Sequence, residues 1–275
     1  MSKLIKNPVT LIGVIISVVV IFLGIFAPFL APYPFEEIHL EDKLQPPSKK
    51  YWLGTDQFGR DILSRIIYGS RISLLVGLGG TLAGLGVGVL LGSTAAYYGK
   101  AVDEAIMRFI DIIMSFPYII IAVALVTVFG PGLFKLMMIV GFLTIPRVAR
   151  ITRAPVLALK EFSFVEAARA IGRGDAQVLI KHILPNCLMV ILVFASLSAA
   201  QAIRIEAALS FLGLGIQPPT PSWGLMLANG RQYILYATWL TTFPGIAISL
   251  TILGFNLVSD GLRDMLDPRL RRVAK

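Results

Sequence analysis

Long apolar stretches alternate with shorter polar ones along this chain of 275 residues. A helix needs about 20 mostly apolar residues to cross the ~30 Å hydrocarbon core of a membrane. Apolar runs that favour such helices cover residues 9–31, 72–98, 105–129, 133–145, 186–212 and 236–258. The pattern therefore predicts an all-α integral membrane protein with six transmembrane helices.

A polar insert, SFVEAARAIGRGDAQVLIKHILP, runs from Ser163 to Pro185 between the fourth and fifth predicted spans. Ser163 and Glu166 have the spacing of a capping box, in which each side chain satisfies the other residue's amide. We therefore expect a helix to begin at Ser163 and to end at Gly172. Its apolar face would contain Phe164, Ala167, Ala168 and Ile171.

A second short helix is predicted directly after the first. Asp175 is expected to cap it, and Pro185 disfavours helical geometry at Leu184, so that a new segment should begin there. Its apolar face would contain Ala176, Leu179, Ile180 and Ile183. Two short amphipathic helices at a bend indicate a docking element for a soluble partner, because small alanines permit close approach. A loop that lies on the membrane surface has the same pattern.

The polar stretch before the second span, residues 32–71, is expected to face outward. Asp61 is predicted to cap a short interfacial helix that ends at Gly69. Its charged residues either pair with one another or meet an external partner: Asp56, Arg60, Asp61 and Arg65.

Small residues recur every fourth position along the second span, at Gly80, Gly84, Gly88 and Gly92. Such a stripe allows another helix to pack backbone against backbone, which favours helix association in lipid. That second helix belongs either to this chain or to a partner.

Charged residues inside the predicted spans include Asp111, Arg204 and Glu206. Asp111 should face protein or water, and Arg108, one turn earlier, is its expected partner. Arg204 and Glu206 lie on different faces near the outer end of the fifth span. They indicate a water-filled pathway, although side chains that reach the outer interface have the same pattern.

Composition agrees with a polytopic membrane protein, since 56% of the residues are hydrophobic and only 15% are charged. The net charge of +9 does not indicate nucleic-acid binding here, because basic residues of membrane proteins gather on the cytoplasmic side. Sixteen of the 25 basic residues lie near the N-terminus, at Lys100 and Arg108, in the loop expected from Arg147 to Pro185 and in the tail, which predicts cytoplasmic termini. The single cysteine, Cys187, excludes an internal disulfide and a CxxC metal site.

The insert resembles the EAA loop of the membrane subunits of ATP-binding-cassette importers. Matching positions are Glu166, Ala167, Ala168, Gly172, Leu184 and Pro185, whereas His182 stands where the loop has isoleucine. The resemblance implies that a coupling helix docks on an ATPase subunit through Ser163, Glu166, Ala167, Ala168, Ile171, Gly172, Leu184 and Pro185.

Three further stretches resemble the dipeptide, oligopeptide and nickel permease family of these importers. They are GTDQFGRDILSRIIYGSRISL (54–74), SFLGLGIQPPTPSWG (210–224) and LRDMLDPR (262–269). The resemblance implies a type I importer permease fold in a bacterial or archaeal cytoplasmic membrane. It divides the chain into an anchor (1–31), an extracytoplasmic segment (32–71), a permease core (72–259) and a cytoplasmic tail (260–275).

The resemblance also implies partners: a second, similar permease subunit, two cytoplasmic ATPases that hold ATP and magnesium, and an extracytoplasmic solute-binding protein. No G-x-x-x-x-G-K-[ST] motif occurs in this sequence, so we expect no ATPase site and no cofactor in the chain. The expected cargo is a di- or oligopeptide, with nickel or a metal chelate as the alternative. A passive channel and an intramembrane enzyme are rival functions. A channel would not need the bend at 163–185, and the sequence offers an enzyme neither an HExxH motif nor a second intramembrane aspartate beside Asp111.

Overall fold

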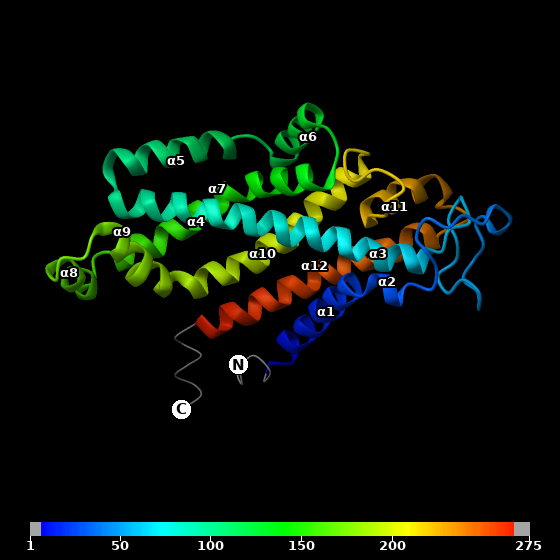
Figure 1. The fold of residues 1–275 in the computed structure, drawn as a ribbon, viewed down its shortest axis with the longest axis horizontal. Coiled ribbons are helices and arrows are strands. Elements are labelled where there is room, and N and C mark those ends of the chain that lie inside the picture. Colours follow the sequence, from blue (N-terminus) through cyan, green and yellow to red (C-terminus); the bar gives the residue numbers. More distant parts are fainter. Residues whose placement is uncertain (1–6, 267–275) are drawn as a thin grey trace.

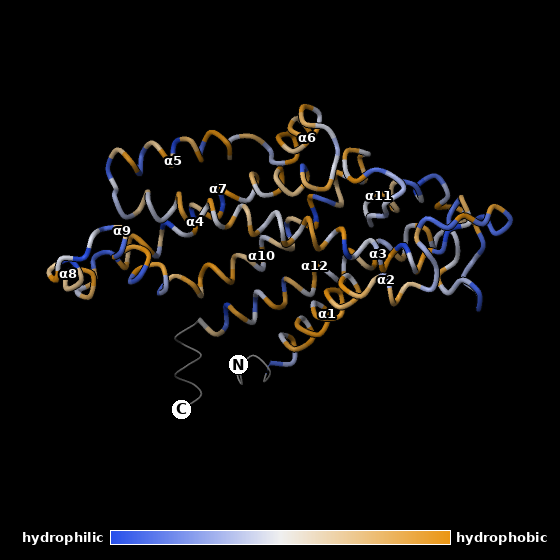
Figure 2. Tube along the Cα trace, in the orientation of Figure 1, coloured by the Kyte–Doolittle hydropathy of each residue, from blue (hydrophilic) through white to orange (hydrophobic). Residues whose placement is uncertain are grey.

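The structure is a computed structural model, which describes residues 7–266. Within that range it is helical apart from loops and one isolated bridge between Thr55 and Asp61, which confirms the all-α prediction. Long helices run side by side, with α8 and α9 at one end and the irregular residues 31–61, here called the outer segment, at the other (Figure 1). Polar residues gather toward both ends (Figure 2).

Helix α1 (Pro8–Ile25) begins where the first apolar run begins, and α2 (Ala27–Leu30) completes the run. Asn7 caps α1, since its side-chain oxygen accepts a 3.0 Å hydrogen bond from the amide of Val9. The helix packs closely on α12 (Trp239–Leu266). A β-carbon on Gly13 would lie 2.5 Å from the β-carbon of Leu257, so glycine sets the distance between these helices.

The helix that Asp61 caps is much longer than predicted. Helix α3 (Ile62–Leu74) continues through a π turn, Leu75–Gly79, into α4 (Gly80–Tyr98), and the continuous stretch has 37 residues. The prediction of a separate helix that ends at Gly69 was therefore wrong, and the predicted boundary between residues 71 and 72 falls inside a continuous helix. Gly69 does not end the helix, because it is where the indole of Trp223 packs, 2.8 Å from the position of a β-carbon.

The glycine stripe of α4 lies against α7 (Leu133–Leu159), so its packing partner is in this chain. A β-carbon on Gly88 would lie 2.7 Å from the β-carbon of Val148. Each of Gly80, Gly84, Gly88 and Gly92 lies against residues of α7 in the same way. The two helices therefore form a tightly packed pair.

The third predicted span is broken. Helices α5 (Lys100–Met114) and α6 (Tyr118–Phe129) meet at an angle of 86°. Pro117 lies at the break. Proline has no backbone N–H to donate to a helical hydrogen bond, so the helix is interrupted there. Asp111 does not pair with Arg108 as expected: it pairs with Arg150 of α7, while Arg108 pairs with Glu104 at 2.8 Å.

The fourth predicted span is longer than expected, because α7 continues through Pro146 and Pro155. Residues 147–159 are therefore helical and extend the helix beyond residue 145, where the fourth span was predicted to end. Within the described residues, length and hydropathy mark four stretches that could cross a membrane, or five if α5 and α6 form one span. Six spans remain a prediction.

Helix α10 (Leu184–Phe211) occupies the centre of the fold and packs against α7, α12 and α11 (Trp223–Gly230). The fifth and sixth predicted spans correspond to the helices α10 and α12. Residues 267–275, which hold most of the basic tail and the end of the motif at 262–269, lie outside the described residues.

Candidate functional site

The polar insert forms a helical bend at one end of the molecule, made of α8 (Ser163–Ala170) and α9 (Asp175–Val178) (Figure 1). One side of the bend is buried: Val165 and Ala168 pack with Val178 and Leu179 in a core shared with α4, α7 and α10. The opposite side is exposed and carries Glu166, Ala167 and Ile171, the last 74% exposed. The apolar face of the first helix was therefore mispredicted, since two of its four members face outward.

Gly172 ends α8 as predicted, with a φ of +81° that residues other than glycine rarely adopt. The amide of Arg173 donates a 3.2 Å hydrogen bond to the carbonyl of Ala168, and the amide of Gly172 donates one of 2.9 Å to Arg169. These bonds satisfy carbonyls at the helix end and turn the chain toward α9.

Both predicted caps in the bend were wrong. Phe162, not Ser163, is the residue before α8, and it makes no side-chain capping bond. Gly174 precedes α9, and Asp175 is the first residue of that helix. The side chain of Asp175 instead accepts a 2.5 Å hydrogen bond from the hydroxyl of Tyr97, the last residue but one of α4.

Tyr97 joins both helices of the bend to α4. Its hydroxyl accepts a 3.1 Å hydrogen bond from Arg169 of α8, whose guanidinium lies 5.3 Å from the centre of the Tyr97 ring. The guanidinium is also 3.8 Å from the Asp175 carboxylate. Because Tyr97 is 7% exposed and α4 is continuous with α3, the bend is fixed to a helix that crosses the whole molecule.

Pro185 does not begin a new segment. The chain passes from α9 through a π turn, Leu179–Ile183, directly into α10, with Pro185 in its first turn, where its missing amide costs no hydrogen bond. The bend is thus joined to α10 by continuous helix. The exposed part of the predicted docking set comprises Ser163, Glu166, Ala167, Ile171, Gly172 and Pro185, while Ala168 is buried and Leu184 is partly buried.

At the other end of the molecule, the charged residues around position 60 pair with one another. The Asp56 carboxylate lies 2.7 Å from Nε of Arg60 and 3.7 Å from Nε of Arg65. Asp61 accepts a 2.8 Å hydrogen bond from the amide of Ser64, as its predicted capping role requires. All four charged side chains are buried, so in this structure they hold the outer segment together and present no surface to a partner.

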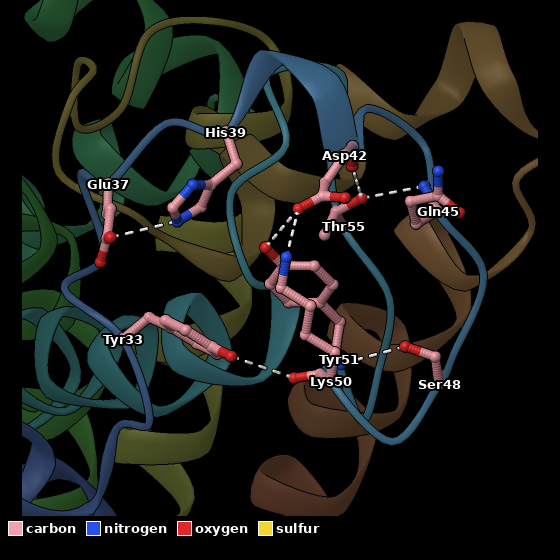
Figure 3. Close-up of polar contacts among 9 residues, drawn as sticks. All are labelled: Tyr33, Glu37, His39, Asp42, Gln45, Ser48, Lys50, Tyr51 and Thr55. Carbon is pink, nitrogen blue, oxygen red and sulfur yellow. Dashed lines mark hydrogen bonds and ion pairs between the residues drawn. The ribbon is translucent and has the colours of Figure 1, made fainter.

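The outer segment carries a second polar network, centred on Asp42 (Figure 3). Its carboxylate accepts hydrogen bonds of 2.7 Å from Lys50 and 2.9 Å from Tyr51. These bonds lower the pKa of Asp42 below its ordinary value, and the bond to Asp42 raises the pKa of Lys50. Burial is the main cause of the raised pKa of Tyr51.

Arg204 and Glu206 lie in different environments, as expected from their opposite faces. Glu206 is fully buried, and its carboxylate accepts hydrogen bonds of 3.0 Å from Ser73 and 2.8 Å from Ser210. It therefore lines no open pathway within this chain, which corrects its assignment as a pathway candidate. Arg204 is exposed and lines a cavity of about 360 Å³.

Tyr97 and Arg147 carry no sequence signal that marks them as functional residues. Tyr97 is the last residue but one of a predicted span. Aromatic residues are common at such positions, because they favour the membrane interface. Arg147 was counted only as a basic residue of a loop, yet it lines the same cavity as Arg204. The described residues contain no cluster of three or more side chains that could hold a metal ion.

Comparisons with known proteins agree with this geometry. Residues 84–272 match the family described as binding-protein-dependent transport system inner membrane component. Residues 1–47 match the N-terminal transmembrane domain of oligopeptide transport permease C.

Full-length relatives are similar over nearly the whole chain. The dipeptide transport system permease protein DppC of Alkalihalophilus pseudofirmus is 44% identical over 98% of this chain and 89% of its own length. The di/tripeptide permease protein DppC of Pseudomonas aeruginosa is 42% identical, over 95% and 88%. The glutathione transport system permease protein GsiD of Pectobacterium atrosepticum is 41% identical, over 98% and 90%. The chain therefore belongs to the family of binding-protein-dependent transport system inner membrane components, which are membrane permeases of ATP-binding-cassette transporters.

Proposed function

We propose that this chain is one permease subunit of an ATP-driven importer that carries di- or oligopeptides into the cell. The observation that supports this most directly is the bend of α8 and α9, whose exposed face is free while its buried face is fixed to α4 and α10. Such an element can receive force from a soluble partner and pass it to helices that cross the membrane. Neither a passive channel nor an intramembrane enzyme needs it.

The proposed partners follow from the family. Two ATPase subunits bind ATP with magnesium and hold the exposed face around Glu166 and Ala167. A second permease subunit, similar to this one, completes the transmembrane pathway. A solute-binding protein delivers the cargo to the outer end, where residues 31–61 lie.

The proposed arrangement has six crossings, with both termini in the cytoplasm. The crossings are α1, α3 with α4, α5 with α6, α7, α10 and α12. The start of α1 and the end of α12 lie toward the end that carries the bend (Figure 1), which is the orientation that the basic residues predict.

The proposed mechanism is alternating access. ATP binding closes the ATPase pair, which carries the bend with it, and the continuous helices α4 and α10 change angle as a result. The pathway then opens outward to receive cargo, and it opens inward after hydrolysis. A peptide is the favoured cargo because the similar permeases bear peptide names, whereas nickel or a metal chelate is the alternative in the resembled family.

A cross-linking experiment tests the docking role. Cys187 is the only cysteine and is buried, so Cys187→Ser provides a background for single introduced cysteines. Ala167→Cys, on the exposed face of α8, should cross-link to an ATPase subunit when the complex is treated with a short bifunctional maleimide. Gln217→Cys, exposed in the loop at the opposite end, is the matched control and should not.

ATP-driven uptake completes the test. Vesicles that contain the whole complex should accumulate labelled dialanine only with ATP and the solute-binding protein. Cross-linking of Gln217→Cys to the ATPase, or dialanine entry without ATP, would contradict the proposed function.

A further inference from the structure

Helix α7 carries three arginines on successive turns, and two of them have acidic partners on α5. Arg153 donates hydrogen bonds of 2.7 and 2.5 Å to Asp103, and Arg150 pairs with Asp111. Arg147 is exposed and has no carboxylate partner among residues 7–266. Its charge is therefore not used to hold α5 on α7.

Arg147 faces two adjoining cavities. One, of about 240 Å³, lies under the break between α5 and α6 and is also lined by Phe116, Thr144 and Gln201. The other, of about 360 Å³, is lined by Arg147 and Arg204 together with Gln201 and Asn256. Its volume lies in the range of small-molecule sites.

The second cavity gathers positive charge and hydrogen-bonding amides. Arg204 donates a 3.1 Å hydrogen bond to the side-chain oxygen of Gln201, which holds that guanidinium beside the cavity. No aspartate or glutamate in the described part of the chain lines either cavity. Two guanidinium groups without a carboxylate form a site for an anion with planar oxygens, such as a carboxylate.

The depth of Arg147 favours a cargo group over a lipid headgroup. Arg147 lies 12 residues before the end of the 27-residue helix α7, which places it about 18 Å from that end at 1.5 Å per residue. In the proposed arrangement α7 crosses the membrane, and a charge near the middle of such a helix is costly unless it faces water or a counter-ion. A transported anion can supply that counter-ion at this depth, which a lipid headgroup does not reach.

We propose that Arg147 and Arg204 form a binding site for the carboxylate of the transported peptide, with Gln201 and Asn256 as hydrogen-bonding partners of its backbone. The proposal rests on the proposed function, because it requires that these cavities belong to the peptide pathway. It gives the permease a selectivity of its own, for cargo with a free carboxylate.

Charge-selective labelling tests this site without relying on transport. Leu197 is exposed and lines the cavity of Arg204, so Leu197→Cys in the Cys187→Ser background places one thiol there. The complete complex is reacted with an anionic sulfonatoethyl methanethiosulfonate or a cationic trimethylammonioethyl one. The anionic reagent should react faster, and Arg147→Gln or Arg204→Gln should each slow it about threefold, the effect of one charge ~7 Å away in a water-filled site.

Arg263→Gln is the matched control, because it removes the same charge from an exposed position near the end of α12 and should leave the rates unchanged. Excess dialanine should protect the thiol in the parent complex, whereas dialanine amide should not. Equal rates for the two reagents, or equal protection by the amide, would overturn the carboxylate site. Loss of the anionic preference in vesicles with phosphatidylglycerol, compared with phosphatidylcholine alone, would assign the site to lipid and overturn it too.

The outcomes separate this site from the function on which it rests. If the wild-type complex does not take up dialanine with ATP, the proposed function fails. If uptake is normal but labelling ignores charge, only the carboxylate site fails.

Discussion

The hydroxyl of Tyr97 donates a 2.5 Å hydrogen bond to the carboxylate of Asp175, which fixes the start of α9 to the end of α4. The two residues are 78 positions apart in the chain, and their contact joins the end of one 37-residue helical stretch, Ile62–Tyr98, to the start of another, Asp175–Phe211. This is the junction through which movement of the bend would reach α4.

Tyr97→Phe should therefore weaken coupling without preventing assembly. The ring remains in its core, but the hydrogen bonds to Asp175 and Arg169 are lost, at a cost of about 0.5–1.5 kcal/mol each. Uptake by vesicles should fall several-fold while ATPase subunits still co-purify. The neighbouring Tyr98→Phe is the control, since Tyr98 is 51% exposed, and equal uptake by the two variants would refute the role of Tyr97.

Gly172 and Gly174 provide a matched pair for the turn between α8 and α9. Gly172 has a φ of +81°, whereas Gly174 has −68°, and neither would place a β-carbon within 4 Å of another residue. Gly172→Ala should cost about 1–2 kcal/mol from backbone conformation alone and should reduce uptake. Gly174→Ala should change little. The measurements are thermal unfolding and uptake, and similar results for both variants would show that the turn geometry is unimportant.

Local sequence signals predicted some helix ends correctly. Asp61 caps its helix and Gly172 ends one, as expected. Asp175 was mispredicted because Tyr97, far away in the sequence, binds its carboxylate. Gly69 was mispredicted because a glycine inside a helix can serve close packing, here against Trp223, as well as termination.

The candidate site was predicted only in part, for a similar reason. The polarity of residues 163–185 and their glycines are local features, so the position of the insert and its helical bend could be predicted from the sequence. The burial of Val165 and the exposure of Ile171 depend on which face meets α4 and α10, and the periodicity of one short helix does not determine that. Likewise, Arg150 and Arg153 are paired and Arg147 is not because the acidic residues of α5, Asp111 and Asp103, lie beside the first two.

The glycine stripe of α4 offers a second matched pair. A β-carbon on Gly88 would lie 2.7 Å from Val148 and 3.0 Å from the carbonyl of Ile145, whereas one on Gly86 would meet nothing within 4 Å. Gly88→Ala should destabilise the protein by about 1–3 kcal/mol through overpacking. Gly86→Ala should be neutral or stabilise by up to about 1 kcal/mol, since alanine favours helix. Thermal unfolding in detergent checks both, and a neutral Gly88→Ala would show that α4 and α7 separate easily.

Glu206 should be a stability residue. Glu206→Ala would leave the hydroxyls of Ser73 and Ser210 without their acceptor and would open a cavity, at a cost of about 2–5 kcal/mol. Glu206→Gln should cost much less, because serine hydroxyls accept as well as donate hydrogen bonds. The expected order of melting temperatures is wild type, then glutamine, then alanine. A melting temperature of Glu206→Ala equal to that of wild type would contradict the buried network.

The Asp42 network should make the outer segment sensitive to pH. Its hydrogen bonds from Lys50 and Tyr51 lower the pKa of Asp42 below 3.8, so its contribution to stability is complete above that pH and is lost as the pH falls through the lowered pKa. The raised pKa values of Tyr51 and Lys50 act in the opposite direction. Their contributions are present below their ordinary values of 10.0 and 10.5 and are lost as the pH rises through the raised values.

Hydrogen exchange of residues 33–61 should therefore be slowest between about pH 4 and 10 after correction for the intrinsic rate, and local protection should fall on both sides. Asp42→Asn removes the carboxylate but keeps the size of the side chain, so it should lower protection at pH 7 and abolish the loss in acid. Glu41→Gln is the control, because Glu41 is the neighbouring carboxylate and lies outside this network. If Asp42→Asn retained the acid transition of the wild type, another carboxylate would be responsible for it.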